Sequence, residues 1–164
     1  MPQDNICILG GTGFVGSHLV NRLCQHDVRI KLLVRNAERA KHLAVLPNIQ
    51  FIECDIYNPQ HLEKHLANTD IVINLVGILN ERGHNGDGFR RVHLDLPRKI
   101  LGACHHNKVP RILHMSALNA DANTGSSHYL RSKGEGENQL HTFAGSCAIT
   151  SFRPSVIFGP GDSF

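Results

Sequence analysis

The chain has 164 residues, of which 41% are hydrophobic and 19% are charged, and its formal net charge is +3. This length suits a single domain with a core of its own, spanning residues 1–164, and the mixed composition argues against intrinsic disorder. A charge this small, with Lys and Arg scattered along the chain, gives no reason to expect a nucleic-acid partner.

Membrane insertion, secretion and metal binding are likewise not predicted. No apolar run reaches the ~18 residues of a membrane helix, and the first strand begins too close to Met1 for a signal peptide, so we expect a cytoplasmic protein. The five cysteines are widely spaced and form no C-x-x-C pair, which is typical of buried, reduced thiols. His61 and His65 lie four residues apart but lack the glutamate of H-E-x-x-H, so solvent-facing histidines are the better interpretation and no metal ligands are expected.

Strand-like apolar runs alternate with helical patterns throughout the sequence. We expect strands at 6–9, 28–34, 49–53, 71–76, 111–115 and 148–152, and helices at 14–25, 36–45, 59–67, 88–107 and 128–143. Parallel strands joined by helices need right-handed crossovers. The pattern therefore predicts an α/β protein, a doubly wound parallel sheet (Rossmann fold) in three αβα layers with strand order 3-2-1-4-5-6. Ligands of such sheets bind at the carboxyl ends of the strands.

A glycine-rich turn connects the first strand to the first helix. Gly10 would permit the tight turn, Gly13 would let the backbone approach a phosphate, and Gly16 would let the helix lie close to the strand. A turn of this kind can be a plain connection, but an apolar strand before it and an amphipathic helix after it favour a pyrophosphate site. The candidate cofactor contacts in this turn are Gly10, Thr12, Gly13, Phe14, Val15 and Gly16.

The end of the second strand bears on the choice of dinucleotide. Sites selective for NAD carry an acidic residue about 20 residues past the glycines, whereas this chain has Arg35 there, with Arg39 nearby. A guanidinium suits a 2′-phosphate, so the sequence favours NADP(H) over NAD(H). The alternative interpretation of Arg35 is an exposed cation at a strand end.

The ends of the third and fourth strands supply further candidate cofactor residues. Asp55 and Ile56 are expected near the adenine, although Asp55 could equally cap a helix or a turn. Asn74, Val76 and Gly77 are expected on the ribose and nicotinamide side.

Three residues near the fifth strand form a candidate catalytic group. Tyr129 and Lys133 are spaced i and i+4 on an expected helix, so both lie on one face. A phenol with a pKa near ~10 is a poor base at neutral pH, and a neighbouring ammonium favours its phenolate form. Ser116, at the end of the fifth strand, could hold the substrate oxygen toward Tyr129. Without the glycine turn and the strand-end serine, the Y-x-x-x-K spacing would indicate only an amphipathic aromatic residue and a solvated lysine.

Taken together, these motifs resemble the short-chain dehydrogenase/reductase superfamily, and within it the extended and atypical members of the NAD-dependent epimerase/dehydratase family. The resemblance extends over essentially the whole chain and is closest to bacterial relatives of the accessory NADPH-binding subunit of respiratory complex I, the NDUFA9-like branch. It rests on GGTGFVG at 10–16, LLVRN at 32–36, CDIYN at 54–58, NLVGI at 74–78, HMSAL at 114–118, YLRSKGEGE at 129–137 and FRPSVIFGPGD at 152–162.

The resemblance implies roles for the candidate residues. The glycines would bind the pyrophosphate, Arg35 would select NADP(H), Ser116, Tyr129 and Lys133 would fill the serine, tyrosine and lysine roles, and Pro154 and Val156 would lie by the nicotinamide. The Ser116-to-Tyr129 interval is shorter than in many extended members. Members of the family also continue into a C-terminal lobe that shapes the substrate pocket, so we expect that lobe to be missing or truncated here.

Three functions remain open at this point. The first is an oxidoreductase or epimerase acting on an unknown small-molecule substrate, with Tyr129 as the general acid or base. The second is a non-catalytic NADPH-binding accessory or assembly subunit that docks on a respiratory NADH dehydrogenase. The third, a redox sensor, is disfavoured because such relatives commonly lack Y-x-x-x-K. Helices 88–107 and 128–143 could also pair two copies in a homodimer.

Overall fold

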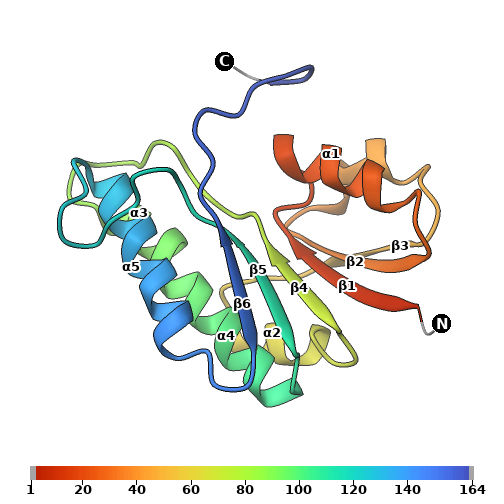
Figure 1. The fold of residues 1–164 in the computed structure, drawn as a ribbon. Helices are drawn as coiled ribbons and strands as arrows, with labels where there is room; N and C mark the ends of the chain where they lie inside the picture. Colours follow the sequence, from red (N-terminus) through yellow and green to blue (C-terminus); the bar gives the residue numbers. More distant parts are fainter. Residues whose placement is uncertain (1–2, 163–164) are drawn as a thin grey trace.

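The computed structural model describes residues 3–162, apart from the side chains of Arg39 and His42. Strands and helices alternate along this part of the chain (Figure 1). The elements are β1 (Asp4–Leu9), α1 (Phe14–Leu23), β2 (Val28–Val34), η1 (Ala37–Leu43), β3 (Ile49–Glu53), α2 (Pro59–His65), β4 (Ile71–Asn74), α3 (Asp87–Arg90), η2 (Arg91–Asp95), α4 (Leu96–Asn107), β5 (Arg111–Met115), α5 (His128–Thr142) and β6 (Ala148–Phe152).

The strands of the described chain form one parallel sheet in the order β3-β2-β1-β4-β5-β6. This order confirms the predicted topology. The fourth strand ends at Asn74 rather than at the predicted Val76, because the Asn74 Oδ1 accepts the Val76 N–H at 3.2 Å and turns the backbone out of the ladder.

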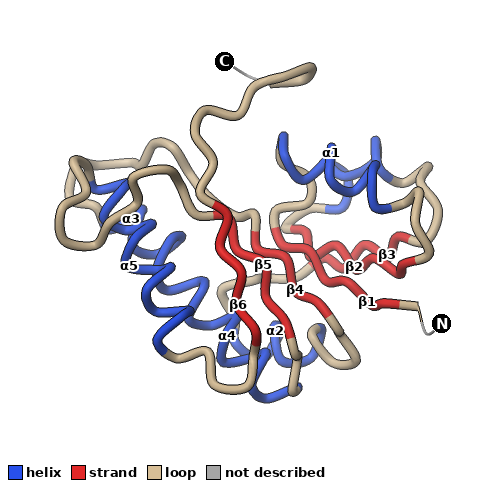
Figure 2. Tube along the Cα trace, viewed as in Figure 1, coloured by secondary structure: helices blue, strands red, loops and turns tan. Residues whose placement is uncertain are grey.

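Helices cover both faces of the sheet, which gives the predicted three layers (Figure 2). Alternate side chains of a strand point to opposite faces. In β1, Ile6 and Ile8 pack in the cluster that includes Val20 of α1, whereas Cys7 and Leu9 pack with α2, α4 and α5. The two cores are therefore built from the two sides of the same strands.

The predicted helix at 36–45 is a 3₁₀ helix over Ala37–Leu43. Residues three apart share one face of a 3₁₀ helix. Ala40 and Leu43 are each 1% exposed and Ala37 packs against the same cluster, so the three-residue spacing of these apolar side chains fits that geometry. Asn36 caps the helix by accepting the Glu38 N–H at 2.9 Å.

The predicted helix at 88–107 is interrupted by a π turn at Arg91–Asp95 between α3 and α4. Pro97 supplies a physical reason. It lacks the N–H that would bond to the carbonyl of His93 in a regular α-helix, so the hydrogen-bonding pattern must change before it. Within the described residues, no helix is both long and apolar enough to cross a membrane.

Candidate functional site

The glycine turn after β1 lies at the carboxyl end of the sheet. Gly10 has φ +82°, a left-handed conformation that glycine adopts without strain, and an added Cβ there would lie 2.9 Å from the Val76 nitrogen. At Gly16 an added Cβ would lie 2.3 Å from the Gly10 carbonyl oxygen. Gly13 is exposed and is the N-cap of α1, so no side chain there covers the first-turn N–H groups. The turn has the shape and the donors that a phosphate needs.

The neighbouring predicted residues divide between exposed and partly buried positions. Thr12 is exposed, whereas Phe14 and Val15 are partly buried in the first turn of α1. The Phe14 ring packs edge-on against His18, with the ring centroids 5.2 Å apart. His18 in turn contacts the Pro160 carbonyl oxygen at 2.9 Å through its Nε2 atom, which ties α1 to the segment after β6.

The residues at the ends of β2 and β3 lie next to one another in the sheet. Val34 pairs with Glu53, so Arg35 and Asp55 follow neighbouring strand ends. Arg35 is exposed, and the side chain of Arg39 lies outside the described residues. Asp55 Oδ1 accepts the Tyr57 N–H at 2.9 Å, which is the turn-forming role that the sequence left open. Ile56 is 6% exposed and packs in the core.

The β4 end brings Gly77 close to the candidate catalytic lysine. An added Cβ at Gly77 would lie 3.3 Å from the Lys133 Nζ and 3.6 Å from the His93 Nε2. Asn74 is 1% exposed and faces inward, where its Nδ2 donates to the His114 Nδ1 at 3.2 Å. Val76 is partly buried. Asn74 thus holds the loop, while Gly77 leaves room for the ammonium.

Tyr129 and Lys133 share one face of α5, and the Lys133 Nζ lies 6.0 Å from the centre of the Tyr129 ring. The ammonium donates to the Met115 carbonyl at 2.9 Å. Burial raises the pKa of the Tyr129 phenol, and burial lowers the pKa of Lys133 to about 8. The lysine therefore lies beside the ring and loses its proton at a lower pH than an exposed lysine, while the pKa of the phenol is set by its burial.

Ser116 and Glu137 are buried and form a network with the exposed Arg153. Its hydroxyl donates to the Glu137 Oε2 at 2.5 Å, and the Arg153 Nε donates to both Glu137 oxygens at 3.0 and 2.9 Å. Burial alone would raise the pKa of Glu137, but the bonds from Arg153 and Ser116 bring it below its usual range. Among the described residues, no hydrogen bond joins Ser116 to Tyr129. The hydroxyl that sequence reasoning assigned to a substrate is engaged by a carboxylate.

His93 is a buried residue of the site that sequence reasoning missed. Its Nε2 accepts the Ile78 N–H at 3.2 Å, so the proton lies on Nδ1, which donates to the Ser132 Oγ at 3.0 Å. The Ser132 hydroxyl donates to the Tyr129 carbonyl at 2.9 Å. The His93 ring also stacks edge-on against the Tyr129 ring at 5.4 Å. His93 thereby joins the β4 loop to the helix that carries Tyr129.

Glu137 was also missed, although it carried a signal. It lies four residues beyond Lys133, and together with Tyr129 it forms an i, i+4, i+8 row on α5. His93 carried no comparable signal, because a lone histidine in an amphipathic helix has many ordinary explanations.

Two glycines let α5 pack closely against its neighbours. An added Cβ at Gly136 would lie 1.8 Å from the His93 carbonyl oxygen in the π turn, and one at Gly134 would lie 2.5 Å from the Ala122 nitrogen.

Gly136→Ala should therefore lower the free energy of unfolding by at least the ~1–3 kcal/mol typical of overpacking, measured by urea denaturation. Gly102→Ala in α4 is the control, because its Cβ would meet nothing within 4 Å; it should be neutral or stabilising by up to ~1 kcal/mol. Equal losses in the two variants would contradict the packing argument.

The segment after β6 crosses above the carboxyl edge of the sheet (Figure 1). It is tied to the β5 loop by two backbone bonds of 2.8 Å, from the Ser116 N–H to the Phe152 carbonyl and from the Leu118 N–H to the Pro154 carbonyl. Pro154 is partly buried and Val156 is 77% exposed. The segment thus faces the same edge as the glycine turn and Tyr129.

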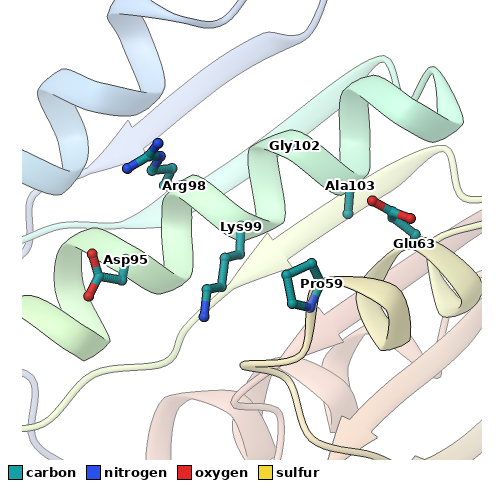
Figure 3. A pocket seen from close by; sticks show the side chains of 7 residues that line it. All are labelled: Pro59, Glu63, Asp95, Arg98, Lys99, Gly102 and Ala103. Carbon is teal, nitrogen blue, oxygen red and sulfur yellow. The ribbon is translucent and has the colours of Figure 1, made fainter.

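A separate groove of about 350 Å³ lies between α2 and α4 (Figure 3). None of the residues predicted for the site lines it. Its lining residues are Pro59, Glu63, Asp95, Arg98, Lys99, Gly102 and Ala103.

Comparisons with known proteins agree with this arrangement. Residues 6–164 match the model of the NAD dependent epimerase/dehydratase family. The chain is 32% identical over 161 residues to NADH dehydrogenase (ubiquinone) 1 alpha subcomplex subunit 9, mitochondrial, of Mus musculus, covering 96% of this chain and 41% of that protein. It is 30% identical over 158 residues to ceramide reductase of Caulobacter vibrioides, covering 96% and 48%. The chain spans less than half the length of either relative.

Among solved structures, the fold is similar to UDP-glucuronic acid 4-epimerase from Bacillus cereus in complex with NAD. The TM-score is 0.81 at 23% sequence identity, and the match covers 95% of this chain and 58% of that chain. This likeness establishes the doubly wound fold.

Proposed function

The chain belongs to the NAD-dependent epimerase/dehydratase family, and from this membership we propose that it binds NADP(H) and catalyses hydride transfer to or from a small-molecule substrate. The observation that carries the proposal is the position of Tyr129 and Lys133 on one face of α5, with Gly77 beside the Lys133 ammonium. The glycine turn fits a pyrophosphate, since its side-chain-free N-cap leaves backbone N–H groups open.

The chain's own residues supply the proton chemistry. When bound, the nicotinamide would supply or accept the hydride. The Tyr129 hydroxyl moves the proton to or from the substrate oxygen. The Lys133 ammonium, which donates to Met115 in the structure, favours the phenolate by its charge and can reach a ribose hydroxyl near Gly77. Its pKa of about 8 keeps it mostly charged at neutral pH.

Ser116 has a narrower role in this proposal than the sequence suggested. To donate to a substrate oxygen, its hydroxyl would have to leave Glu137. A serine that stays on Glu137 can still accept a hydrogen bond through its remaining lone pair. The proposal therefore rests on Tyr129 and Lys133, and it assigns Ser116 to holding the substrate only if Glu137 releases it.

Arg35 is the proposed determinant of NADP(H) over NAD(H). Arg35→Ala should weaken NADPH binding by about tenfold or more and leave NADH binding nearly unchanged, because only NADPH carries the 2′-phosphate. Isothermal titration calorimetry with NADPH, NADP, NADH and NAD measures this directly. Arg29→Ala, an exposed arginine earlier in β2, is the control and should leave both affinities unchanged.

Two results would contradict the proposal at different levels. Equal losses for NADPH and NADH would remove Arg35 from the 2′-phosphate. No binding of any of the four dinucleotides would overturn the cofactor site itself.

The similarity to the mouse subunit favours a second candidate function, that of an NADPH-binding accessory or assembly subunit of a respiratory NADH dehydrogenase. In that role the cofactor would stabilise the fold and no substrate would turn over. Affinity purification of the full-length protein from its native membranes separates the two functions. Stoichiometric recovery of NADH dehydrogenase subunits, unchanged by Tyr129→Phe, supports the accessory role, and recovery of none of them contradicts it.

A further inference from the structure

Three side chains from different elements meet beyond the end of β3. The Arg91 guanidinium of the π turn lies over the Tyr57 ring, with its carbon 4.4 Å from the ring centre. The Lys99 Nζ of α4 lies 5.9 Å from the same centre and donates to the Tyr57 carbonyl at 2.8 Å. Both cations are thus held in place by contacts that involve no carboxylate.

Arg35 follows directly after the end of β2, the strand next to β3 in the sheet. The Cys54 N–H donates to the Val34 carbonyl at 3.0 Å, so Arg35 begins beside the segment that leads to Tyr57. The charges also interact, because burial raises the pKa of the Tyr57 phenol while the positive charges of Arg91 and Arg35 oppose that rise. The positive charges of both arginines therefore act on the same hydroxyl.

Among the described residues, no acidic side chain forms an ion pair with Arg35, Arg91 or Lys99. Asp55, two residues before Tyr57, accepts the Tyr57 N–H, and its negative charge opposes those of the arginines at the phenol. Three cations that have no ion-pair partner among the described residues favour an anion beside them, and a guanidinium suits a phosphate.

From this geometry we propose that Arg91, oriented by the Tyr57 ring, is a second binding residue for the 2′-phosphate of NADP(H), acting together with Arg35. The inference rests on the proposed cofactor function. The π turn gives the arginine its position, because Arg91 is its first residue and points to the carboxyl edge of the sheet. Specificity for the 2′-phosphate would then come from two elements far apart in the sequence.

The test compares 2′,5′-ADP with 5′-AMP, two probes that differ only in the 2′-phosphate. Arg91→Gln, which removes the charge and keeps a polar side chain, should weaken 2′,5′-ADP binding by about tenfold or more and leave 5′-AMP binding unchanged. Arg91→Lys keeps the charge and should recover part of the loss. Arg98→Gln removes the same charge from α4, where Figure 3 shows Arg98 on the other side of the helix from Lys99, and should change neither affinity.

The outcomes separate this inference from the function on which it depends. If the unmodified chain binds NADPH but Arg91→Gln leaves 2′,5′-ADP binding unchanged, the inference is wrong and the cofactor site stands. An equal loss for both probes also overturns it, since Arg91 would then support the adenosine or the fold. If the unmodified chain binds neither NADPH nor 2′,5′-ADP, the proposed function itself fails.

Discussion

Replacing Tyr129 with phenylalanine is expected to slow hydride transfer by about 10²- to 10⁴-fold, the usual contribution of a general acid or base, with NADPH affinity essentially unchanged. The substitution keeps the ring, which packs edge-on against Phe89 at 6.0 Å and His93 at 5.4 Å. No hydrogen bond from a described residue reaches the hydroxyl, so its loss breaks no structural contact. The rate is measured as NADPH oxidation by the full-length protein with a panel of carbonyl substrates.

Thr142→Val is a matched control, because it removes an exposed hydroxyl at the end of the same helix. It should leave the rate unchanged. A Tyr129→Phe variant that keeps the full rate would exclude the proton-transfer role. A variant that loses NADPH binding together with the rate would instead make Tyr129 a binding residue.

The phenol can also be observed without a substrate. The chain has two tyrosines and no tryptophan, so a Tyr57→Phe background leaves Tyr129 as the single tyrosine in an ultraviolet pH titration. Burial should place its pKa above the ordinary value, and NADP with its positive nicotinamide ring should lower it. An identical titration with and without NADP would argue against a catalytic phenol at this position.

The sheet was predictable because each strand is a short apolar run and helices between the strands begin at recognisable signals. Asn58 and Pro59 begin α2 and Ser127 begins α5, as side-chain caps and an N-terminal proline predict. The π turn was not predictable from periodicity, because one extra residue in a helical turn changes the spacing of the apolar residues at that turn alone. Pro97 alone does not mark its position, because a proline also fits the first turn of an ordinary helix.

The sequence placed the candidate residues at the strand ends where the structure has them, but it did not predict the directions of their side chains. Ile112 and His114 in β5, and Ser116 directly after it, occupy every second position and point to the α5 side. This two-residue spacing alone could have placed the Ser116 hydroxyl near Glu137. The Lys133 bond to a carbonyl and the stacking of Arg91 on Tyr57 depend on which elements meet in space. No local pattern in a single sequence indicates which elements will pack together in this way.

Acid is expected to unfold the chain through two buried neutral histidines. Burial, reinforced by the charge of Lys133, lowers the pKa of both His93 and His114 to about 3. The unfolded chain takes up these protons near the ordinary histidine pKa of 6.5, whereas the folded chain resists them down to about pH 3. Stability is therefore fully present above pH 6.5 and is lost as the pH falls toward 3, by roughly 2 kcal/mol per histidine by about pH 5.

The two sites differ in what protonation would disrupt. A proton on the His93 Nε2 would remove the acceptor of the Ile78 N–H, and a proton on the His114 Nδ1 would repel the Asn74 amide. The His114 Nε2 already lacks a hydrogen-bond partner among the described residues, so it has no acceptor to share a new charge. Both histidines must stay neutral for the loops around Lys133 to keep their positions.

Urea denaturation between pH 7 and about pH 5 measures the effect as a slope. His93→Asn and His114→Asn should each reduce the slope by about 1 kcal/mol per pH unit averaged over this range, approaching about 1.4 kcal/mol per pH unit, one proton's worth, at its acid end, whatever their absolute stability. His84→Asn, an exposed histidine in the loop before α3, should leave the slope unchanged. If both buried variants keep the full slope, the acid sensitivity comes from other groups. A loss of slope in only one variant would identify which contact keeps the edge of the sheet folded around Tyr129 and Lys133.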